Sequence, residues 1–130
     1  KPDFENTSFD VVEKRLIIEP ELPSNIQDLI TYYFNEKVKI DGFEGNMIFT
    51  ISKFIQEVSQ IDDGKRVDLI LNFNVYLNKP SLSKIKIIEG QVSSYGTLTG
   101  DFSLKEFDTV INNTQADLVL RLSRDLKSKI

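Results

Sequence analysis

Residues 66–78 read RVDLILNFNVYLN, in which apolar and polar side chains alternate along the chain. Alternation of this kind is typical of a β-strand with one buried face, because successive side chains on a strand point to opposite sides. Ile70 is the one apolar exception on the polar side. The pattern predicts that five side chains lie together on the face that the helices cover: Val67, Leu69, Leu71, Phe73 and Val75.

The segments around this strand indicate an antiparallel meander. Residues 46–59 are also strand-like, with a phase slip near residues 53–55 that indicates a β-bulge or a strong bend. Residues 62–64 read DDG, a hairpin turn signal, and Asn78-Lys79-Pro80-Ser81 turns the chain into a last strand over about residues 84–97. Gly90 and Gly96 within that strand predict a bulge or bend.

The N-terminal part of the chain predicts one more strand and a helix. Residues 14–19 are predicted to form a strand, because Leu16, Ile17 and Ile18 are apolar and largely β-branched. Ser24 or Asn25 is a plausible N-cap for a helix that the Asp41-Gly42 pair ends. Apolar residues recur at three- and four-residue intervals and so lie on one face of that helix: Ile26, Leu29, Ile30, Tyr33, Phe34 and Val38.

A second helix is predicted from residue 103 to the C-terminus. Ser103 and Glu106 form a capping box, and Phe107, Ile111, Leu118, Leu122 and Leu126 form an apolar stripe. The fold class is therefore α+β, with two helices packed on one face of a four-stranded mixed or antiparallel sheet in the order β-α-β-β-β-α. We expect a single domain over residues 1–130, in which residues 1–8 form a flexible N-terminal arm.

Composition argues against catalysis. The chain has no His and no Cys, which removes the commonest general acid–base group, Ser-His and Cys-His nucleophilic sites, and Cys/His zinc sites. The adjacent Asp62 and Asp63 are better explained by the turn that they occupy. The formal net charge of −4 disfavours nucleic acid as a partner. We expect no enzymatic activity, no cofactor and no metal site.

Two groups of residues remain as candidate binding sites. The first is the polar face of the central strands, which both helices leave uncovered; it is either simply hydrated or a docking face for a protein partner, with Ile48, Ile70, Asn72, Asn74 and Tyr76 as its candidate residues. The second is a possible anion patch of Lys65, Arg66, Lys84 and Lys86, for which lysines that protect strand edges are the plainer interpretation.

The element order and several local sequences resemble the globular part of bacterial envelope lipoproteins of the LPS-assembly (LptE-like) type. The matching pieces are RLIIE at residues 15–19, the helix over residues 25–38, the hairpin over residues 46–77, VSSY at residues 92–95 and LRLSRDL at residues 120–126. SLKE at residues 103–106 and RDL at residues 124–126 also resemble small alphaproteobacterial lipoproteins of unknown role.

The resemblance implies a periplasmic domain that is anchored to the outer membrane through a removed N-terminal lipobox segment and that docks on a membrane-embedded protein. It also implies a possible lipid or lipopolysaccharide ligand, which that family contacts with basic residues in the hairpin loop and in the loop before the last helix. Here the second of these loops, residues 98–102, reads LTGDF and has no basic residue. A soluble ligand-binding or adaptor domain that uses the exposed sheet face is the alternative.

Overall fold

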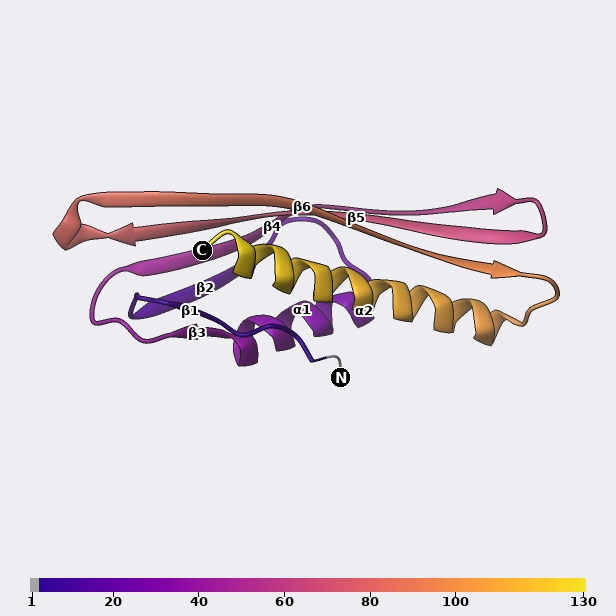
Figure 1. Ribbon diagram of the computed structural model, residues 1–130, viewed down its shortest axis with the longest axis horizontal. Coiled ribbons are helices and arrows are strands. Elements are labelled where there is room, and N and C mark those ends of the chain that lie inside the picture. Colours follow the sequence, from indigo (N-terminus) through magenta and orange to yellow (C-terminus); the bar gives the residue numbers. More distant parts are fainter. Residues whose placement is uncertain (1–2) are drawn as a thin grey trace.

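The structure, a computed structural model, describes residues 3–130 (Figure 1). Its frame is an antiparallel meander of three 16-residue strands, β4 (Asn46–Ile61), β5 (Gly64–Lys79) and β6 (Lys84–Thr99). Strand β2 (Glu13–Ile18) pairs in parallel with the first part of β4, so the four-stranded sheet has the order β2-β4-β5-β6. The prediction of a mixed four-stranded sheet is confirmed.

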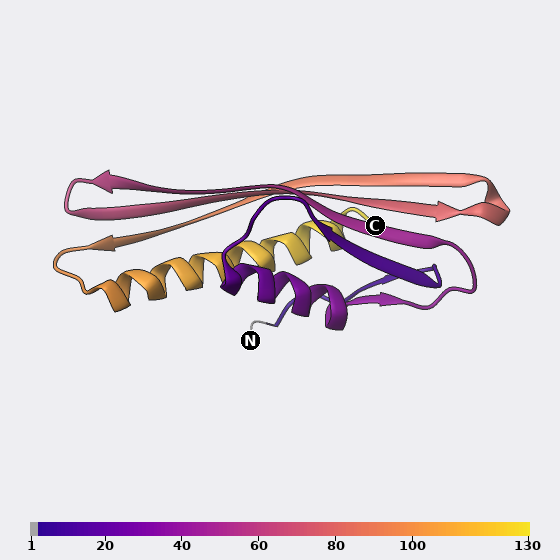
Figure 2. The same cartoon turned by 180° about the vertical axis from the view of Figure 1, so that it is seen from behind.

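Both helices lie on one side of this sheet, as Figures 1 and 2 show from opposite directions. Helix α1 (Ser24–Lys37) and the longer α2 (Leu104–Ser128) contact each other beneath the strands. The predicted capping box opens α2, since Ser103 accepts from the Glu106 amide while the Glu106 side chain accepts from the Ser103 amide. No helix of the described residues is long and apolar enough to cross a membrane.

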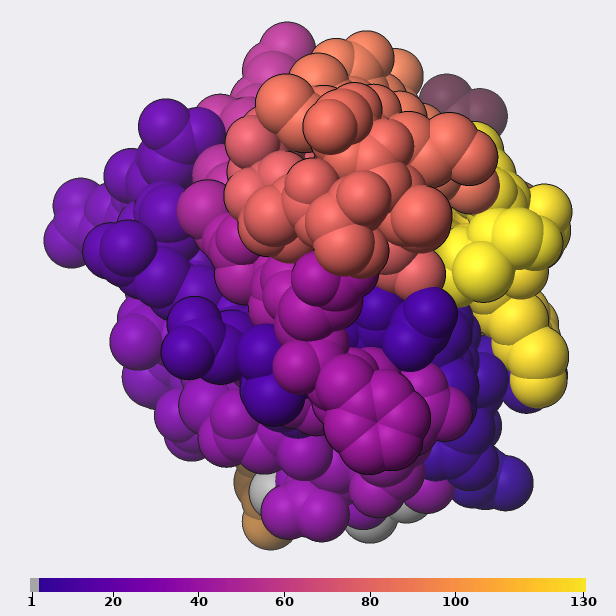
Figure 3. Space-filling model, turned by 90° about the vertical axis from the view of Figure 1, so that its left-hand side faces the viewer, coloured from indigo at the N-terminus to yellow at the C-terminus, as the bar shows by residue number. Residues whose placement is uncertain are grey.

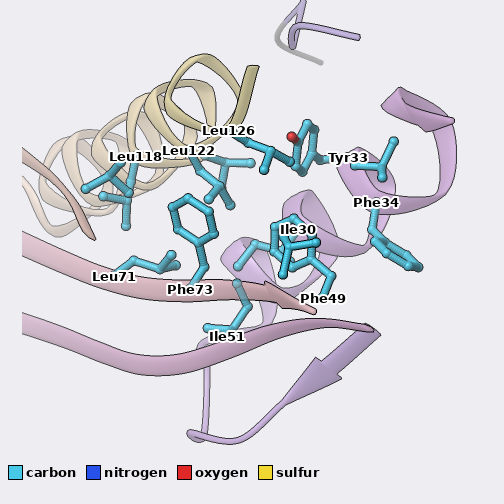
Figure 4. Packing of buried hydrophobic residues seen from close by; sticks show 14 of the residues in the cluster. Ile30, Tyr33, Phe34, Phe49, Ile51, Leu71, Phe73, Leu118, Leu122 and Leu126 are labelled. Carbon is cyan, nitrogen blue, oxygen red and sulfur yellow. The ribbon is translucent and has the colours of Figure 1, made fainter. Parts of the chain in front are cut away.

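The core lies between the sheet and the helices. All five side chains of β5 that were predicted to face the helices are at most 2% exposed: Val67, Leu69, Leu71, Phe73 and Val75. Figure 4 shows Leu71 and Phe73 pointing from β5 toward the α2 side chains Leu118 and Leu122. Phe73 stacks on Phe49 of β4, with ring centroids 5.8 Å apart.

The predicted irregularity in β4 is a β-bulge at Ser52, where the pairing with β5 shifts by one residue. Before the bulge the buried positions of β4 are odd-numbered and end at Ile51; after it, Phe54 takes the position opposite Leu71. The extra residue therefore restores apolar residues to the inner face after the phase slip in the sequence.

Of the bulge or bend predicted in the last strand, the bulge is wrong, because β6 pairs with β5 without any register shift from Lys84 to Thr99. Gly90 and Gly96 instead allow neighbouring side chains to come close to the backbone of β6. A Cβ atom at Gly90 would lie 2.5 Å from Cζ of Phe73 and 2.5 Å from a carboxylate oxygen of Asp125. A Cβ atom at Gly96 would meet Thr114 and Val110 of α2.

Both predicted ends of the first helix are wrong. Pro23 is the N-cap residue and provides no side-chain hydrogen bond, whereas Asn25 donates instead to the Gln115 side chain of α2 at 2.9 Å. The helix ends at Lys37 because the β-branched segment that follows becomes strand β3 (Val38–Ile40). The Lys14 ammonium of β2 then binds the carbonyl oxygens of Phe34, Asn35 and Val38 at this helix end.

Most of the predicted N-terminal arm is ordered structure. Thr7–Phe9 form strand β1, which pairs in parallel with β3, and Phe4 is only 1% exposed. The Glu5 amide donates to the Ser123 hydroxyl of α2 at 3.2 Å, which places this segment on the helix side of the molecule. Although most of the segment is polar, burial of Phe4 and Phe9 in the core holds it against the rest of the molecule. Residues 1 and 2 of the predicted arm lie outside the described residues.

Candidate binding surfaces

The outer face, defined as the side of β4, β5 and β6 that is turned away from the helices, carries the predicted docking residues. Tyr76 pairs with Ile48 of β4 and Ile87 of β6, and Ile70 pairs with Ile55 of β4 and Ser93 of β6. All five candidates, Ile48, Ile70, Asn72, Asn74 and Tyr76, are half-buried. The structure thus brings the predicted residues onto one face.

The outer face has two apolar rows that are separated by a polar band. Tyr76 lies six positions after Ile70 on β5, which corresponds to about 20 Å along a strand. Between these rows lie Asn72 and Asn74, with Thr50 and Glu89 as the cross-strand neighbours of Asn74. A partner that fits this face would need apolar contacts at both ends and hydrogen-bonding groups in the middle.

The polar band contains a shallow cavity of about 390 Å3 beside the bulge. It is lined by Ser52, Asn72, Phe73, Asn74, Glu89 and Gly90. The Oδ1 atom of Asn72 is buried and has no hydrogen-bond partner among the described residues. A buried acceptor without a donor is energetically costly, and this Oδ1 atom lies beneath the surface of the polar band.

Residues 3–9 do not cover the outer face, since they pack on the helix side. Beyond the bulge, β4 is also unpaired on its far edge, because β2 pairs only with residues 46–51. In this half of the hairpin, residues 56–60 are exposed. At the right of Figure 1, α1 does not reach this half of the hairpin and only α2 lies beneath it.

The structure does not bring the four candidate anion-binding residues together. Lys65 pairs with Leu98 at one end of the meander, and Lys86 pairs with Leu77 at the other. On β5, position 77, which pairs with Lys86, lies twelve positions after Lys65, which corresponds to about 40 Å. Arg66 is also engaged locally, since it contacts Asp68 at 3.0 Å and lies 4.1 Å from the Tyr95 ring.

A polar cluster ties the free edge of β6 to α2. The Ser94 hydroxyl donates to the Asp117 carboxylate at 2.7 Å, and Arg121 donates to the same carboxylate at 2.8 Å. Burial raises the pKa of Asp117, but the two hydrogen bonds and the charges of Arg121 and Arg124 outweigh it, so the pKa lies below its ordinary value. The cluster therefore holds a charged carboxylate under the sheet edge.

Stability should fall in acid partly through Asp117. A carboxyl whose pKa is lower in the folded protein stabilises it above the pKa of the unfolded chain, and this stabilisation is lost as the pH falls through the folded pKa. We expect Asp117→Asn to make the free energy of unfolding less dependent on pH between about pH 7 and pH 3. Urea unfolding at several pH values in that range measures this pH dependence. Ser94→Ala should flatten the profile in the same direction, and an unchanged profile in both variants would contradict this role.

Several exposed apolar residues were not predicted as site residues. Ile55 and Ile87 extend the two rows of the outer face, and their cross-strand pairing with Ile70 and Tyr76 can be derived only from the register. Phe43 is 99% exposed and lies in the loop before β4. The KIKI sequence at residues 84–87, which alternates lysine with isoleucine, was a signal for an exposed strand end.

Solved structures with a similar fold include bacterial lipoproteins. The minor lipoprotein of Acinetobacter baumannii matches with a TM-score of 0.59 at 10% identity, over 91% of this chain and 93% of that chain. The rare lipoprotein B of Shewanella oneidensis matches with a TM-score of 0.57 at 11% identity, over 90% and 95%. The uncharacterized lipoprotein B of Nitrosomonas europaea matches with a TM-score of 0.54 at 12% identity, over 98% and 90%.

At these identities the likeness shows the fold, and the lipoprotein-like fold expected from the resemblance is confirmed. No protein-family model matches the sequence, and the search of curated proteins found no match.

Proposed function

We propose that this chain is the globular domain of a non-enzymatic cell-envelope lipoprotein that docks on a membrane-embedded protein, in outer-membrane or lipopolysaccharide assembly. The observation that carries the proposal is the outer face, whose two apolar rows and polar band are covered by no described element. The similarity in fold to bacterial lipoproteins supports the placement in the envelope.

The size of the outer face suits a specific protein interface. Three strands of 16 residues measure about 50 Å by about 14 Å, or on the order of 700 Å2. A standard interface buries about 800 Å2 on each partner. Ile48, Ile70 and Tyr76 would be its apolar contacts, and Asn72 and Asn74 would select a partner with matching donors.

The proposal is tested with the immobilised domain and a detergent-solubilised envelope fraction. The wild type should retain a discrete membrane protein, and Ile70→Asp and Tyr76→Asp should each reduce its capture at least about tenfold, because a charge would be buried without a partner. Leu104→Asp is the matched control, since Leu104 is 84% exposed at the start of α2, away from the outer face. Unchanged capture by folded Ile70→Asp and Tyr76→Asp proteins would rule out this docking face.

The alternative function, a soluble ligand-binding or adaptor domain, uses the same face and is separated by the same experiment. In that case the two variants would lose a partner from the soluble fraction and none from the membrane fraction. The envelope location has its own test, because a lipobox Cys directly upstream of Lys1 in the gene supports it. A start Met at that position would contradict it.

A further inference from the structure

The end of the molecule that carries the β5–β6 turn gathers exposed apolar side chains. Nine large hydrophobic residues of the described chain are exposed, and three of them, Val58, Tyr95 and Leu104, lie elsewhere. The six at this end are Val12, Phe43, Leu82, Ile85, Ile87 and Ile130, which we call the loop end. Figure 3 looks directly at it and shows the turn after β5, the loop before β4 and the C-terminal residues side by side.

The loop that carries Phe43 is held in place by its backbone. The Gly42 amide donates to the Val11 carbonyl at 3.0 Å, and the Val12 amide donates to the Gly45 carbonyl at 3.2 Å. Gly45 has a φ of 85°, a conformation that glycine adopts without strain. An ordered loop therefore presents a phenylalanine that is 99% exposed. Holding this ring in water is unfavourable unless something outside the molecule receives it.

The second apolar tip is tied to the first. The short 3₁₀ helix η1 (Pro80–Leu82) presents Leu82, which is 60% exposed. The Ser81 hydroxyl donates to the Glu44 carboxylate, so the two loops are joined next to both tips. Behind them lies a cavity of about 370 Å3 with an apolar lining that includes Phe9, Val11, Leu77, Leu82 and Ile130.

Lysines lie beside the Leu82 tip, whereas Phe43 lies between Asp41 and Glu44. Residues 77–88 contain Lys79, Lys84 and Lys86 and no acidic residue, and all three lysines line the cavity. Lys79 is paired with Asp10 at 2.7 Å, whereas Lys84 and Lys86 are exposed and make no side-chain hydrogen bond or ion pair with any described residue. The turn at the opposite end of the meander carries Asp62 and Asp63 beside Lys65 and Arg66, so its charges offset one another. The ammonium groups of Lys84 and Lys86 therefore favour an anionic headgroup beside Leu82.

We propose that the loop end inserts Phe43 and Leu82 into the surface of a lipid bilayer that contains anionic headgroups, which Lys84 and Lys86 contact. Two exposed apolar tips with lysines beside Leu82 match the interfacial region, where acyl chains lie beneath charged headgroups. A bilayer also accepts small protruding tips without the complementary shape that a protein interface requires. This inference is independent of the docking proposal, since it requires no protein partner.

The first test uses the absence of tryptophan from the chain, which makes a single introduced Trp an unambiguous probe. Phe43→Trp fluorescence should shift to the blue with vesicles of phosphatidylcholine and phosphatidylglycerol, and less with phosphatidylcholine alone. Leu104→Trp is the matched control at the other end and should not respond. No shift for Phe43→Trp, or an equal shift for both probes, would overturn the proposal.

The second test measures vesicle binding by flotation. The Phe43→Ser/Leu82→Ser variant should bind at least about tenfold more weakly, because apolar area withdrawn from water drives insertion. Lys84→Gln/Lys86→Gln should bind more weakly at low salt and lose most of its salt dependence, since screening acts on exposed charges. Leu104→Ser and Lys105→Gln are the controls and should bind like the wild type. Wild-type binding by both loop-end variants would overturn the proposal, whatever their behaviour in the capture experiment.

Discussion

Replacing Leu71 by alanine is expected to lower the free energy of unfolding by about 2 to 5 kcal/mol, as removal of a fully buried leucine side chain does. Leu71 is 0% exposed and lies on the inner face of β5, between Phe54 of β4 and Val92 of β6. The helices close the space above it, so the surroundings cannot collapse into the cavity without moving α2. Urea or thermal unfolding measures the loss.

Ile70→Ala is the matched control for this measurement. Ile70 is the preceding residue on the same strand but points to the outer face and is only half-buried. We expect it to lower the free energy of unfolding by about 1 kcal/mol or less, since it loses less buried area and leaves no closed cavity. If the two variants lost equal stability, or if Leu71→Ala lost less than about 1 kcal/mol, the register of β5 would be inverted.

Gly90→Ala is expected to cost about 1 to 3 kcal/mol, the range for overpacked cores. The added methyl group would lie 2.5 Å from Cζ of Phe73. The Phe73 ring has little room to move, because it stacks on the Phe49 ring of the neighbouring strand β4. An alanine in an ordinary strand position would instead be favoured over glycine, so the sign of the effect identifies the cause.

A double substitution shows whether the Phe73 ring is the obstacle. Phe73→Leu shortens the side chain, so Gly90→Ala should cost less when combined with it than when introduced alone. The destabilisation of the double variant would then be smaller than the sum of the two single effects. Additive effects would mean that the methyl group meets Asp125 instead, which lies at the same distance. The exposed neighbour Gln91→Ala should have little effect.

The parts of the fold that could be predicted from the sequence are those with a regular pattern of their own. The alternation in residues 66–78, the phase slip near residue 53 and the capping box at Ser103 each reflect a local rule, and each is found in the structure. Strands β1 and β3 were missed because three-residue segments have no measurable period. Their apolar residues are buried through contacts with distant parts of the chain.

The site residues divide in the same way. The outer-face residues follow directly from the alternation of β5, so the sequence could predict which side chains share that face. The turns predicted at residues 62–64 and 78–81 lie at opposite ends of the central strand, so the sequence already indicated that Lys65 and Lys86 lie far apart. Phe43 lies in the loop before β4 and Leu82 in η1, and the pairing of Asn46 with Asn78 and the Ser81–Glu44 contact bring these segments together.

The pairing of β2 with β4 has a consequence for the order of folding. Strands β4, β5 and β6 are joined by connections of two and four residues, residues 62–63 and 80–83, so their pairing can begin next to the turns, between near neighbours in the chain, and extend from there. In contrast, Glu13 pairs with Asn46, a separation of 33 residues (46 minus 13). Closing so long a loop is slower and entropically more costly. The N-terminal third should therefore join a meander that has already formed, and the junction between β2 and β4 is where the native molecule should first open.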